Sequence, residues 1–431
     1  MYNTIDYFRE ASYIMKNSSS TIKSSLTLLW LCFLVYSILS MSKTAFSSSM
    51  AAIIHDGIFT NSQAGIINAS FYFLYGVAQL FGAKLIDKTS PITLLTIGLS
   101  GAVLSTLGMA FANTFISILI IWSACGLLQF AAWPCVIKII AEYVLDDHRG
   151  KAMTIISFSY CLGNLMNYFT ASIILSCTSW RVIFIMNSIV LAITLYFWIT
   201  SGANASKILS HESTINTKYD SKMHQTSDAI EIPYTRLLAI SGIMLLLVPG
   251  FIRTALDLGI KSWAPTLMVQ SYGISPSFAT ALTTILMIIN LSGVFLANYI
   301  YPKYFKNPIS ALNACFIICL PATLLMLLIG KISLLAIVLL LIFSTTIMYC
   351  GNQLINVVVP SFFNKYNRSG SVAGILNAAA SFGAVASNFG YGYLADKFGW
   401  SGTILSWSIM GIISIIFCVL TIPVWKKFNK R

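Results

Sequence analysis

Residues 332–358 read ISLLAIVLLLIFSTTIMYCGNQLINVV, a run without Asp, Glu, Lys or Arg. An α-helix rises about 1.5 Å per residue, so about 20 apolar residues cross the ~30 Å hydrocarbon core of a bilayer. Residues 332–358 are therefore long and apolar enough to cross a membrane as one helix. Runs of similar length and composition recur almost from end to end of the chain.

The composition of the whole chain is typical of a membrane protein. Of its 431 residues, 57% are hydrophobic and only 9% are charged, and the mean hydropathy is +0.81. A soluble chain of this length needs far more charge to cover its surface. The sequence therefore predicts an all-α integral membrane protein and excludes a soluble enzyme.

Twelve apolar runs are the predicted transmembrane helices, six in a half that covers 26–202 and six in a half that covers 237–424. They lie near residues 26–54, 64–86, 91–112, 115–143, 151–177, 181–202, 237–270, 276–300, 308–330, 332–358, 371–395 and 401–424. The segment before the first run has no apolar centre followed by a cleavage site, so we expect a retained span rather than a signal peptide.

Three polar segments flank the halves: an N-terminal segment at 1–25, a linker at 203–236 and a basic tail at 425–431. The linker has too few apolar residues to bury a core, which predicts a flexible connection. It contains His211 and His224 without a nearby Cys or a regular spacing. We expect solvated loop residues there rather than a metal site.

The formal charge of +13 does not indicate a nucleic-acid binder, because the basic residues are spread over short segments between spans. Nineteen Lys and Arg residues lie in the N-terminal segment, the linker, the tail and the loops on that side. The loops on the opposite side hold only Arg181, Lys331 and Lys397. Basic loops face the cytoplasm, so both termini are predicted to be cytoplasmic.

A weak internal repeat relates the two halves. KTA at 43–45 in span 1 matches RTA at 253–255 in span 7, and TSWRVIF at 178–184 is similar to FGWSGTI at 398–404. Pseudo-symmetric halves of this kind hold a solute site near the middle of the membrane, at their junction. They move alternately around that site, which predicts transport by alternating access.

The loop GAKLIDK after span 2 resembles the corresponding loop of the major facilitator superfamily, through Gly82, Asp87 and Lys88. The segment CGLLQFAAWPCVIKIIAEYVLDDHRGKAM at 125–153 resembles the organophosphate:phosphate antiporter family. Its matching positions are Gly126, Gln129, Trp133, Pro134, Lys138, Arg149 and Gly150. The resemblance implies the major facilitator fold, a bacterial cytoplasmic (inner) membrane, and a gating or structural role for these motif residues.

The resembled family binds the phosphate of its substrate with one arginine in span 1 and another in span 7. Lys43 falls on the first arginine position, and Asp257 falls on the second. Gly163 stands at the position of a family histidine, and Gln79 at that of a family lysine. These departures leave the solute class open beyond a small organic anion.

Lys43 lies about 17 residues into span 1. An ammonium group that faces lipid there costs roughly 2.5–3.5 kcal/mol, so we expect Lys43 to face a central cavity. A substrate-binding role and a structural ion pair with a neighbouring helix are both compatible with this position.

Arg253, Asp257 and Lys261 are spaced four residues apart in span 7, so they share one stripe of the helix. Asp257 can pair with either neighbour. The stripe is either a self-neutralised set of charges or a site where Asp257 responds to a proton or to the substrate. Arg253 also offers the planar fork that suits a carboxylate or a phosphate.

Four further side chains are substrate-binding candidates. Tyr36 and Tyr75 match aromatic positions that face the pore in the resembled family, and are otherwise packing residues. Lys138 lies four residues before Glu142 near the cytoplasmic end of span 4, where a local ion pair is the alternative. Asn164 is an amide within a span and either binds solute or bridges helices.

The sequence predicts a monomeric secondary transporter of a small, anionic solute in the lipid bilayer, without a cofactor, a metal or nucleic acid. No glycine run that cradles a nucleotide is present, which disfavours transport driven by ATP. Two alternatives stay open: a proton-coupled symporter with Asp257 as the titrating group, and a membrane sensor that does not transport.

The charge asymmetry makes a topological prediction. Tags placed at residue 1, near Ser221 in the linker and at Arg431 are expected on the cytoplasmic side, because the excess of Lys and Arg lies there. Protease or reporter accessibility in whole cells measures this. A linker tag on the outer face contradicts the arrangement of two six-helix halves.

Overall fold

A computed structural model describes residues 25–143, 146–202, 233–305, 307–329, 332–363, 366 and 368–429. Helices make up nearly all of this part, and no strand occurs within it. The segments 1–24, 203–232 and 430–431, which hold most of the predicted N-terminal segment, the linker and the last two residues of the predicted tail, lie outside the described residues.

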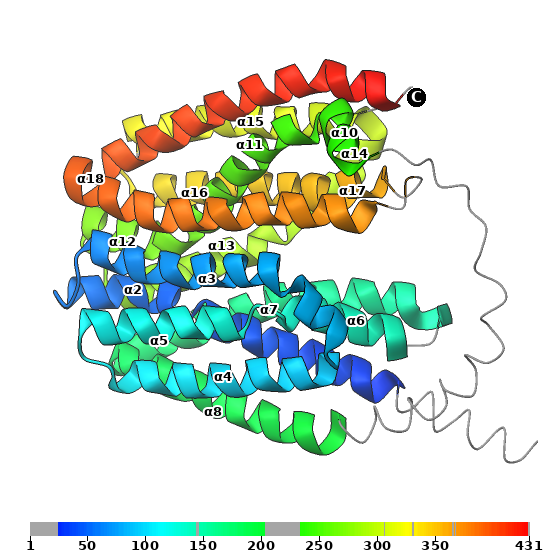
Figure 1. The fold of residues 1–431 in the computed structure, drawn as a ribbon. Helices are drawn as coiled ribbons and strands as arrows, with labels where there is room; N and C mark the ends of the chain where they lie inside the picture. The colour runs from blue at the N-terminus through cyan, green and yellow to red at the C-terminus, as the bar shows by residue number, and fades with distance from the viewer. Residues whose placement is uncertain are drawn as a thin grey trace, which may run out of the picture.

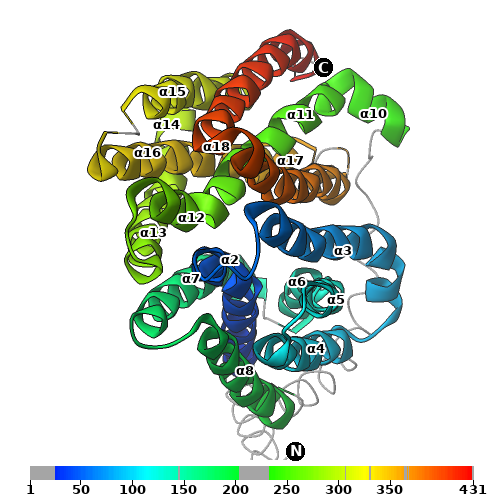
Figure 2. The same ribbon diagram turned by 90° about the vertical axis from the view of Figure 1, so that its left-hand side faces the viewer.

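The helices of residues 25–202 form one group (Figure 2). The first predicted span is a helix over Ser25–His55, which is interrupted at Thr44. The helices that follow are α2 (Ala45–His55), α3 (Asn61–Lys88), α4 (Pro91–Phe111), α5 (Phe115–Leu128), α6 (Ala132–Tyr143), α7 (Asp146–Cys177), α8 (Trp180–Phe197) and the π-helical turn η1 (Trp198–Gly202).

The helices of residues 234–429 form the second group. They are α10 (Tyr234–Ser241), α11 (Ile243–Thr254), η2 (Ala255–Gly259), α12 (Ile260–Tyr272), α13 (Pro276–Asn290), α14 (Ser292–Tyr304), α15 (Pro308–Ile329), α16 (Leu334–Gln353), η3 (Leu354–Val358), α17 (Val359–Ser361) and α18 (Ser369–Asn429). Gly399, at φ 68°, divides α18 into two arms, drawn orange and red in Figure 1.

The described helices agree with the predicted twelve spans. Ten of them are long and apolar enough to cross a membrane, and α18 supplies two such arms although it counts once. α7, with 32 residues, is long enough to be the remaining span. Several spans are not regular α-helix throughout. The interruptions include Thr44, the segment between α5 and α6, Leu291 between α13 and α14, and the π-helical turns η1, η2 and η3.

Local signals in the sequence explain where several helices begin. The Thr60 hydroxyl accepts a hydrogen bond from the backbone nitrogen of Gln63, and the side-chain oxygen of Gln63 accepts one from the backbone nitrogen of Thr60. This capping box starts α3. Ser275 caps α13, whose first residue is Pro276. Short loops join successive helices and make them antiparallel. The start of the first helix and the end of α18 therefore lie at one end of the bundle (Figure 1). We call it the terminal end, and the opposite one the far end.

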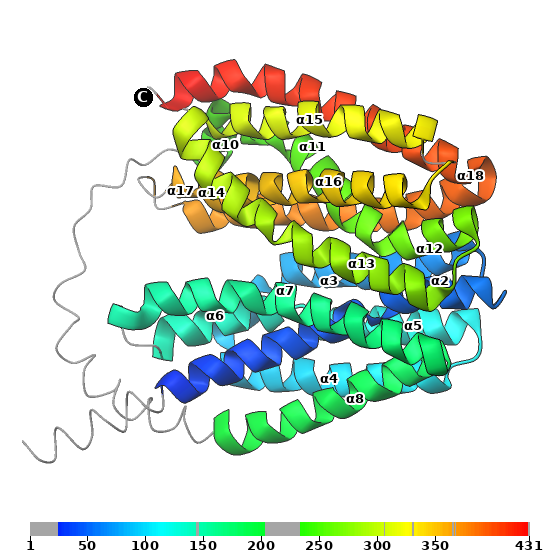
Figure 3. The same cartoon turned by 180° about the vertical axis from the view of Figure 1, so that it is seen from behind.

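The two groups of helices touch along α3 and α18, α7 and α13, and α2 and α12 (Figures 1 and 3). Glycines allow α3 and α18 to approach: a Cβ at Gly65 would lie 2.5 Å from the Asn388 carbonyl oxygen, and one at Gly392 would lie 2.4 Å from that of Asn61. Buried amides join the same helices, since Asn68 donates to the Asn388 side chain at 2.6 Å. Small residues and amides are the usual means of packing helices in lipid.

Asp396 connects the halves at the far end. Its carboxylate accepts hydrogen bonds from the backbone nitrogen of Ser62 at 2.7 Å and from the amide of Asn61 at 2.8 Å, at the first turn of α3. Burial alone would raise the pKa of Asp396, but the hydrogen bonds from Ser62 and Asn61 outweigh it and hold that pKa below its ordinary value. An anion is favoured there because the N-terminus of a helix carries partial positive charge.

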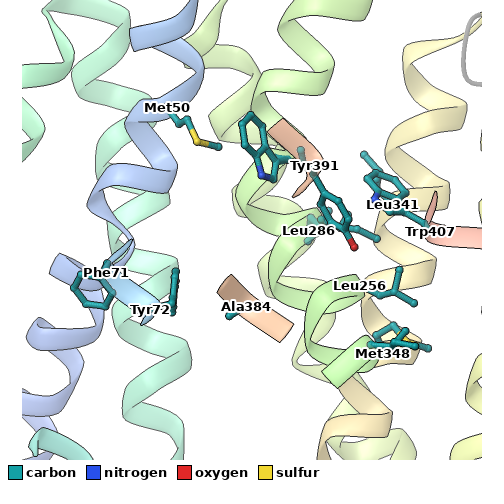
Figure 4. Close-up of a cluster of buried hydrophobic side chains, with 14 of the residues drawn as sticks. Met50, Phe71, Tyr72, Leu256, Leu286, Leu341, Met348, Ala384, Tyr391 and Trp407 are labelled. Atoms are coloured by element: carbon teal, nitrogen blue, oxygen red, sulfur yellow. The ribbon is translucent and has the colours of Figure 1, made fainter. Parts of the chain in front are cut away.

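The hydrophobic core also crosses from one half to the other. Figure 4 shows Phe71 and Tyr72 of α3 on one side, and Leu256 and Met348 of the second half on the other. Ala384 of α18 lies between them in the same view. All five belong to one buried cluster, so apolar as well as polar groups form the contact between the halves.

We expect Asp396→Asn to loosen the far end. The change removes a charge at a helix N-terminus, which is worth about 0.3–1 kcal/mol at an exposed position. Spin labels replacing the exposed residues Phe111 and Leu335, at far-end termini of α4 and α16, report the separation of the halves. The population with longer label-to-label distances should grow.

Asp56→Asn is the matched control for this measurement. Asp56 is exposed at the same end, and its described ion pair is with its neighbour His55 at 3.6 Å. The control should leave the distance distribution as in the unmodified protein. Equal distributions for both variants would mean that the Asp396 contact does not hold the halves together.

Candidate functional site

Two interrupted helices meet beside Lys43. The first helix ends there, and Thr44 leaves regular helix geometry with its hydroxyl bonded to the carbonyl of Met41 at 3.2 Å. The fourth span is interrupted at Gln129, whose amide donates to Ser42 at 3.2 Å and to the sulfur of Cys125 at 3.1 Å. The hydrogen bond from Gln129 to Ser42 thus joins the two interrupted helices directly next to Lys43.

The ammonium group of Lys43 lies among aromatic rings. Its Nζ is 4.0 Å from the ring centre of Tyr75, 5.4 Å from that of Tyr72 and 5.9 Å from that of Phe71. Cation–π contacts of this kind stabilise a cation that has left water. In the described part of the chain, no carboxylate forms an ion pair with Lys43.

Asp257 lies in the π-helical turn η2 and is paired on both sides. Its Oδ2 is 3.4 Å from Nη1 of Arg253, and its Oδ1 contacts the Nζ of Lys261. The side chains are 5%, 9% and 14% exposed for Arg253, Asp257 and Lys261, so the first is the deepest. The pairing that their spacing predicts is confirmed. π-Helical turns are frequent at functional sites.

A cavity with an empty volume of about 580 Å³, its open part included, lies between the two halves. Asp257 and Lys261 line it. The other residues that line it, from helices of both halves, are Thr44, Tyr72, Tyr160, Cys161, Asn164, Tyr168, Leu258, Ser262, Met287, Asn290, Leu291 and Tyr349. Aromatic, amide and charged groups from both halves thus surround one shared space.

Several polar atoms of the cavity wall lack a partner within the protein. Oδ1 of Asn164 and Nδ2 of Asn290 are buried without a described hydrogen bond, although Oδ1 of Asn290 accepts from Thr346 at 2.7 Å. Cys161 and Tyr349 meet across the halves, with 2.8 Å between sulfur and hydroxyl. Unpaired buried polar groups are costly, so a solute or water that bonds to them is favoured.

The charges near the cavity do not cancel. Lys43, Arg253 and Lys261 contribute three positive charges and Asp257 one negative charge, which leaves a net charge of 3 − 1 = +2. Of the 13 acidic residues in the sequence, only Asp257 lies deep inside a predicted span. Glu142 lies near the end of the fourth. The site therefore attracts an anion.

The other predicted substrate-binding residues lie around this site in different ways. Asn164 lines the cavity, and Tyr75 contacts Lys43 while accepting a hydrogen bond from Gln79 at 3.0 Å. Tyr36 instead packs on Trp133, with ring centres 4.8 Å apart.

Three predicted basic residues do not line the cavity. Lys43 lies beside its wall, with its Nζ 5.4 Å from the ring centre of Tyr72. Lys138 donates to the carbonyl of Ile86 at 3.0 Å, near the end of α3, and Arg253 lies behind Asp257. A role for Lys138 in direct binding stays a prediction.

Sequence reasoning gave no binding role to Lys261, Tyr160, Asn290 or Tyr349, which the structure places in the cavity wall. Lys261 was identified only as a member of the charged stripe. Asn290 and Tyr349 each stand in an otherwise apolar run, which is a weak signal for a cavity-facing position.

The described residues of the family-like motifs do not line the cavity. A Cβ at Gly82 would come within 2.2 Å of the Phe130 ring, so Gly82 allows α3 to pack on the fourth span. Pro134 lies in the first turn of α6 and Lys88 in the last turn of α3. The side chains of Asp87 and Arg149 are outside the described part of the structure.

Comparison with known proteins matches the model described as Major Facilitator Superfamily to residues 32–388. The chain belongs to the Major Facilitator Superfamily. It is a multi-pass membrane transporter and not an enzyme. The predicted fold class is thereby confirmed, and so is the resemblance to this superfamily.

Several curated transporters are similar to this facilitator. A probable hexose phosphate transport protein of Chlamydia trachomatis is 20% identical over 91% of this chain and 89% of its own. A hexuronate transporter of Bacillus subtilis is 22% identical over 89% and 91% of the two chains. A putative glycerol-3-phosphate transporter 2 of Arabidopsis thaliana is 32% identical, over 27% of this chain and 24% of its own.

Solved structures share the facilitator's fold. A bacterial homolog of the human lysosomal transporter Spinster, in an inward-facing and occupied conformation, matches with a TM-score of 0.73 and 14% identity over 93% of this chain and 97% of its own. A D-xylose-proton symporter matches with a TM-score of 0.72 and 15% identity over 92% and 97%.

Gly163 provides a test of packing next to the site. A Cβ there would lie 2.0 Å from the carbonyl oxygen of Ser37, so Gly163→Ala should separate α7 from the first helix and cost about 1–3 kcal/mol. Gly374→Ala, with nothing within 4 Å of its Cβ, is the control and should not lower stability. The stability of both variants is measured as the melting temperature in detergent. An equal change in the two variants would contradict the close contact at Gly163.

Proposed function

We propose that this transporter exchanges a small organic phosphate, of the hexose phosphate class, across the membrane by alternating access. The observation that carries the proposal is Lys43, a cation in mid-span that has aromatic partners and no described carboxylate. A buried charge without a counter-ion is costly, so an anionic solute is the natural partner.

The net charge of the site suits a phosphate monoester. Such an ester carries about −1.5 to −2 charges at neutral pH, and the site carries +2 from Lys43, Arg253, Lys261 and Asp257. The cavity wall adds tyrosines, whose rings pack on a sugar and whose hydroxyls bond to it. The full-length relatives named as hexose phosphate transport proteins support the same solute class.

The contacts between the halves support a state that is closed at the far end. The described hydrogen bonds between halves join residues at the far end, such as Asn61 with Gln270 at 3.2 Å, or in the middle, such as Tyr168 with the carbonyl of Lys261 at 3.4 Å. We infer that solute enters from the terminal end. With both termini in the cytoplasm, as the charge asymmetry predicts, this is the inward-facing state of a monomeric inner-membrane transporter.

Lys43 variants test the proposed function. Lys43→Ala in proteoliposomes should lower hexose phosphate counterflow at limiting solute by roughly ten- to a hundredfold, because a charge-assisted contact is worth about 1.5–3 kcal/mol. Lys43→Arg keeps the cation and should retain more activity than Lys43→Ala.

Lys303→Ala is the control, because Lys303 is exposed and donates to Tyr299 at 3.2 Å, away from the cavity. Its counterflow should equal that of the unmodified protein. Full activity of Lys43→Ala would make Lys43 a structural residue, and absence of any uptake by the unmodified protein would favour the alternative of a sensor.

A further inference from the structure

The Asp257 carboxylate divides its two oxygens between two unlike cations. Oδ2 faces Arg253, which is the most buried of the three, does not line the cavity and also contacts the hydroxyl of Thr254. Oδ1 faces Lys261, which lines the cavity and whose Nζ lies 4.6 Å from the ring centre of Tyr349. Arg253 is thus enclosed behind Asp257, whereas Lys261 lines the solute space together with Asp257.

We infer that Asp257 is a specificity-determining residue that sets the number of negative charges the cavity accepts. This inference rests on the proposed function. Asp257 cancels one of three positive charges, so a solute with two negative charges leaves the closed site neutral. A monoanion leaves one positive charge uncompensated, and a trianion leaves one negative charge. Each uncompensated charge in a dry site weakens binding.

The geometry assigns the two cations different parts in this selection. Arg253 has a rigid guanidinium and stays with Asp257, since no cavity contact is open to it. Lys261 has a flexible stem and a compact ammonium, which can turn from Asp257 to a solute oxygen while it keeps the Tyr349 ring. Lys261 from the second half and Lys43 from the first half can then bind one anionic solute from opposite sides.

The solutes after which the relatives are named differ in charge. A hexuronate has one carboxylate, whereas a hexose phosphate approaches two negative charges at neutral pH. The Bacillus subtilis hexuronate transporter and the chlamydial hexose phosphate transport protein are both similar to this chain over most of its length. The net charge of +2 around Asp257 therefore favours a dianion, such as a hexose phosphate, over a monoanion.

The test measures how well a hexuronate, a hexose phosphate and a hexose bisphosphate each compete for counterflow of labelled hexose phosphate in proteoliposomes at neutral pH. Lys261→Gln leaves a net charge of +1, so its preference should shift toward the hexuronate by about tenfold. Asp257→Asn leaves +3, so its preference should shift toward the bisphosphate. The double variant Asp257→Asn with Lys261→Gln restores +2 and should recover the preference for the monophosphate.

Acidification is an internal check on the charge count. A phosphate monoester takes up its second proton near pH 6, so at about pH 5.5 the hexose phosphate is mostly a monoanion. Its advantage over the hexuronate should then shrink in the unmodified protein. Lys303→Gln, which removes an exposed cation outside the cavity, should behave as the unmodified protein at both pH values.

Opposite shifts in the two single variants, with recovery in the double variant, support the inference. Equal competition profiles in all variants, or a double variant that resembles either single one, overturn it while the proposed function stands. Asp257→Asn leaves two cations unpaired, so its folding is checked by its melting temperature. Where it fails to fold, Lys261→Gln and the double variant decide between the same outcomes. An unmodified protein that carries no hexose phosphate overturns the proposed function itself.

Discussion

The cost of placing an ionised side chain in hydrocarbon governs where charge stands in this protein. Charged residues make up 9% of the sequence, and nearly all of these residues lie in loops and termini. The exceptions deep in the spans are Lys43, Arg253, Asp257 and Lys261, and the structure brings them to the junction of the halves. Aromatic rings and one shared carboxylate replace the water that these groups have lost.

Three of the departures from regular helix geometry lie beside these charges. Backbone groups exposed to lipid must be hydrogen-bonded within the helix, so irregular turns are tolerated only inside the protein. The interruption at Thr44, the one at Gln129 and the π-helical turn at Asp257 all lie beside the charged cluster. Side chains support two of these interruptions, through the hydrogen bond from Gln129 to Ser42 and the one from Thr44 to the carbonyl of Met41.

Much of the fold was predictable, because the hydropathy of a segment shows whether it lies in the lipid bilayer or in water. The number of spans and the division into halves follow from apolar runs of fixed length. The site was predictable only in part. Lys43 and Asp257 were found because charge in a span is rare, whereas Tyr160 and Tyr349 look like ordinary packing residues until the halves are assembled. The contact of Tyr36 with Trp133 depends on helix rotation, which hydropathy does not encode.

The charge balance also bears on how the transporter moves. The polar contacts between the halves are individually weak, since hydrogen bonds between membrane helices average about 0.6 kcal/mol, so the far-end contacts can open. An empty site with a net charge of +2 is costly to seal from water on both sides, whereas a site that holds a dianion is neutral. The loaded transporter therefore crosses the closed state more readily than the empty one. A transporter that returns only when loaded exchanges one anion for another, so the charges around Asp257 favour antiport over net uptake.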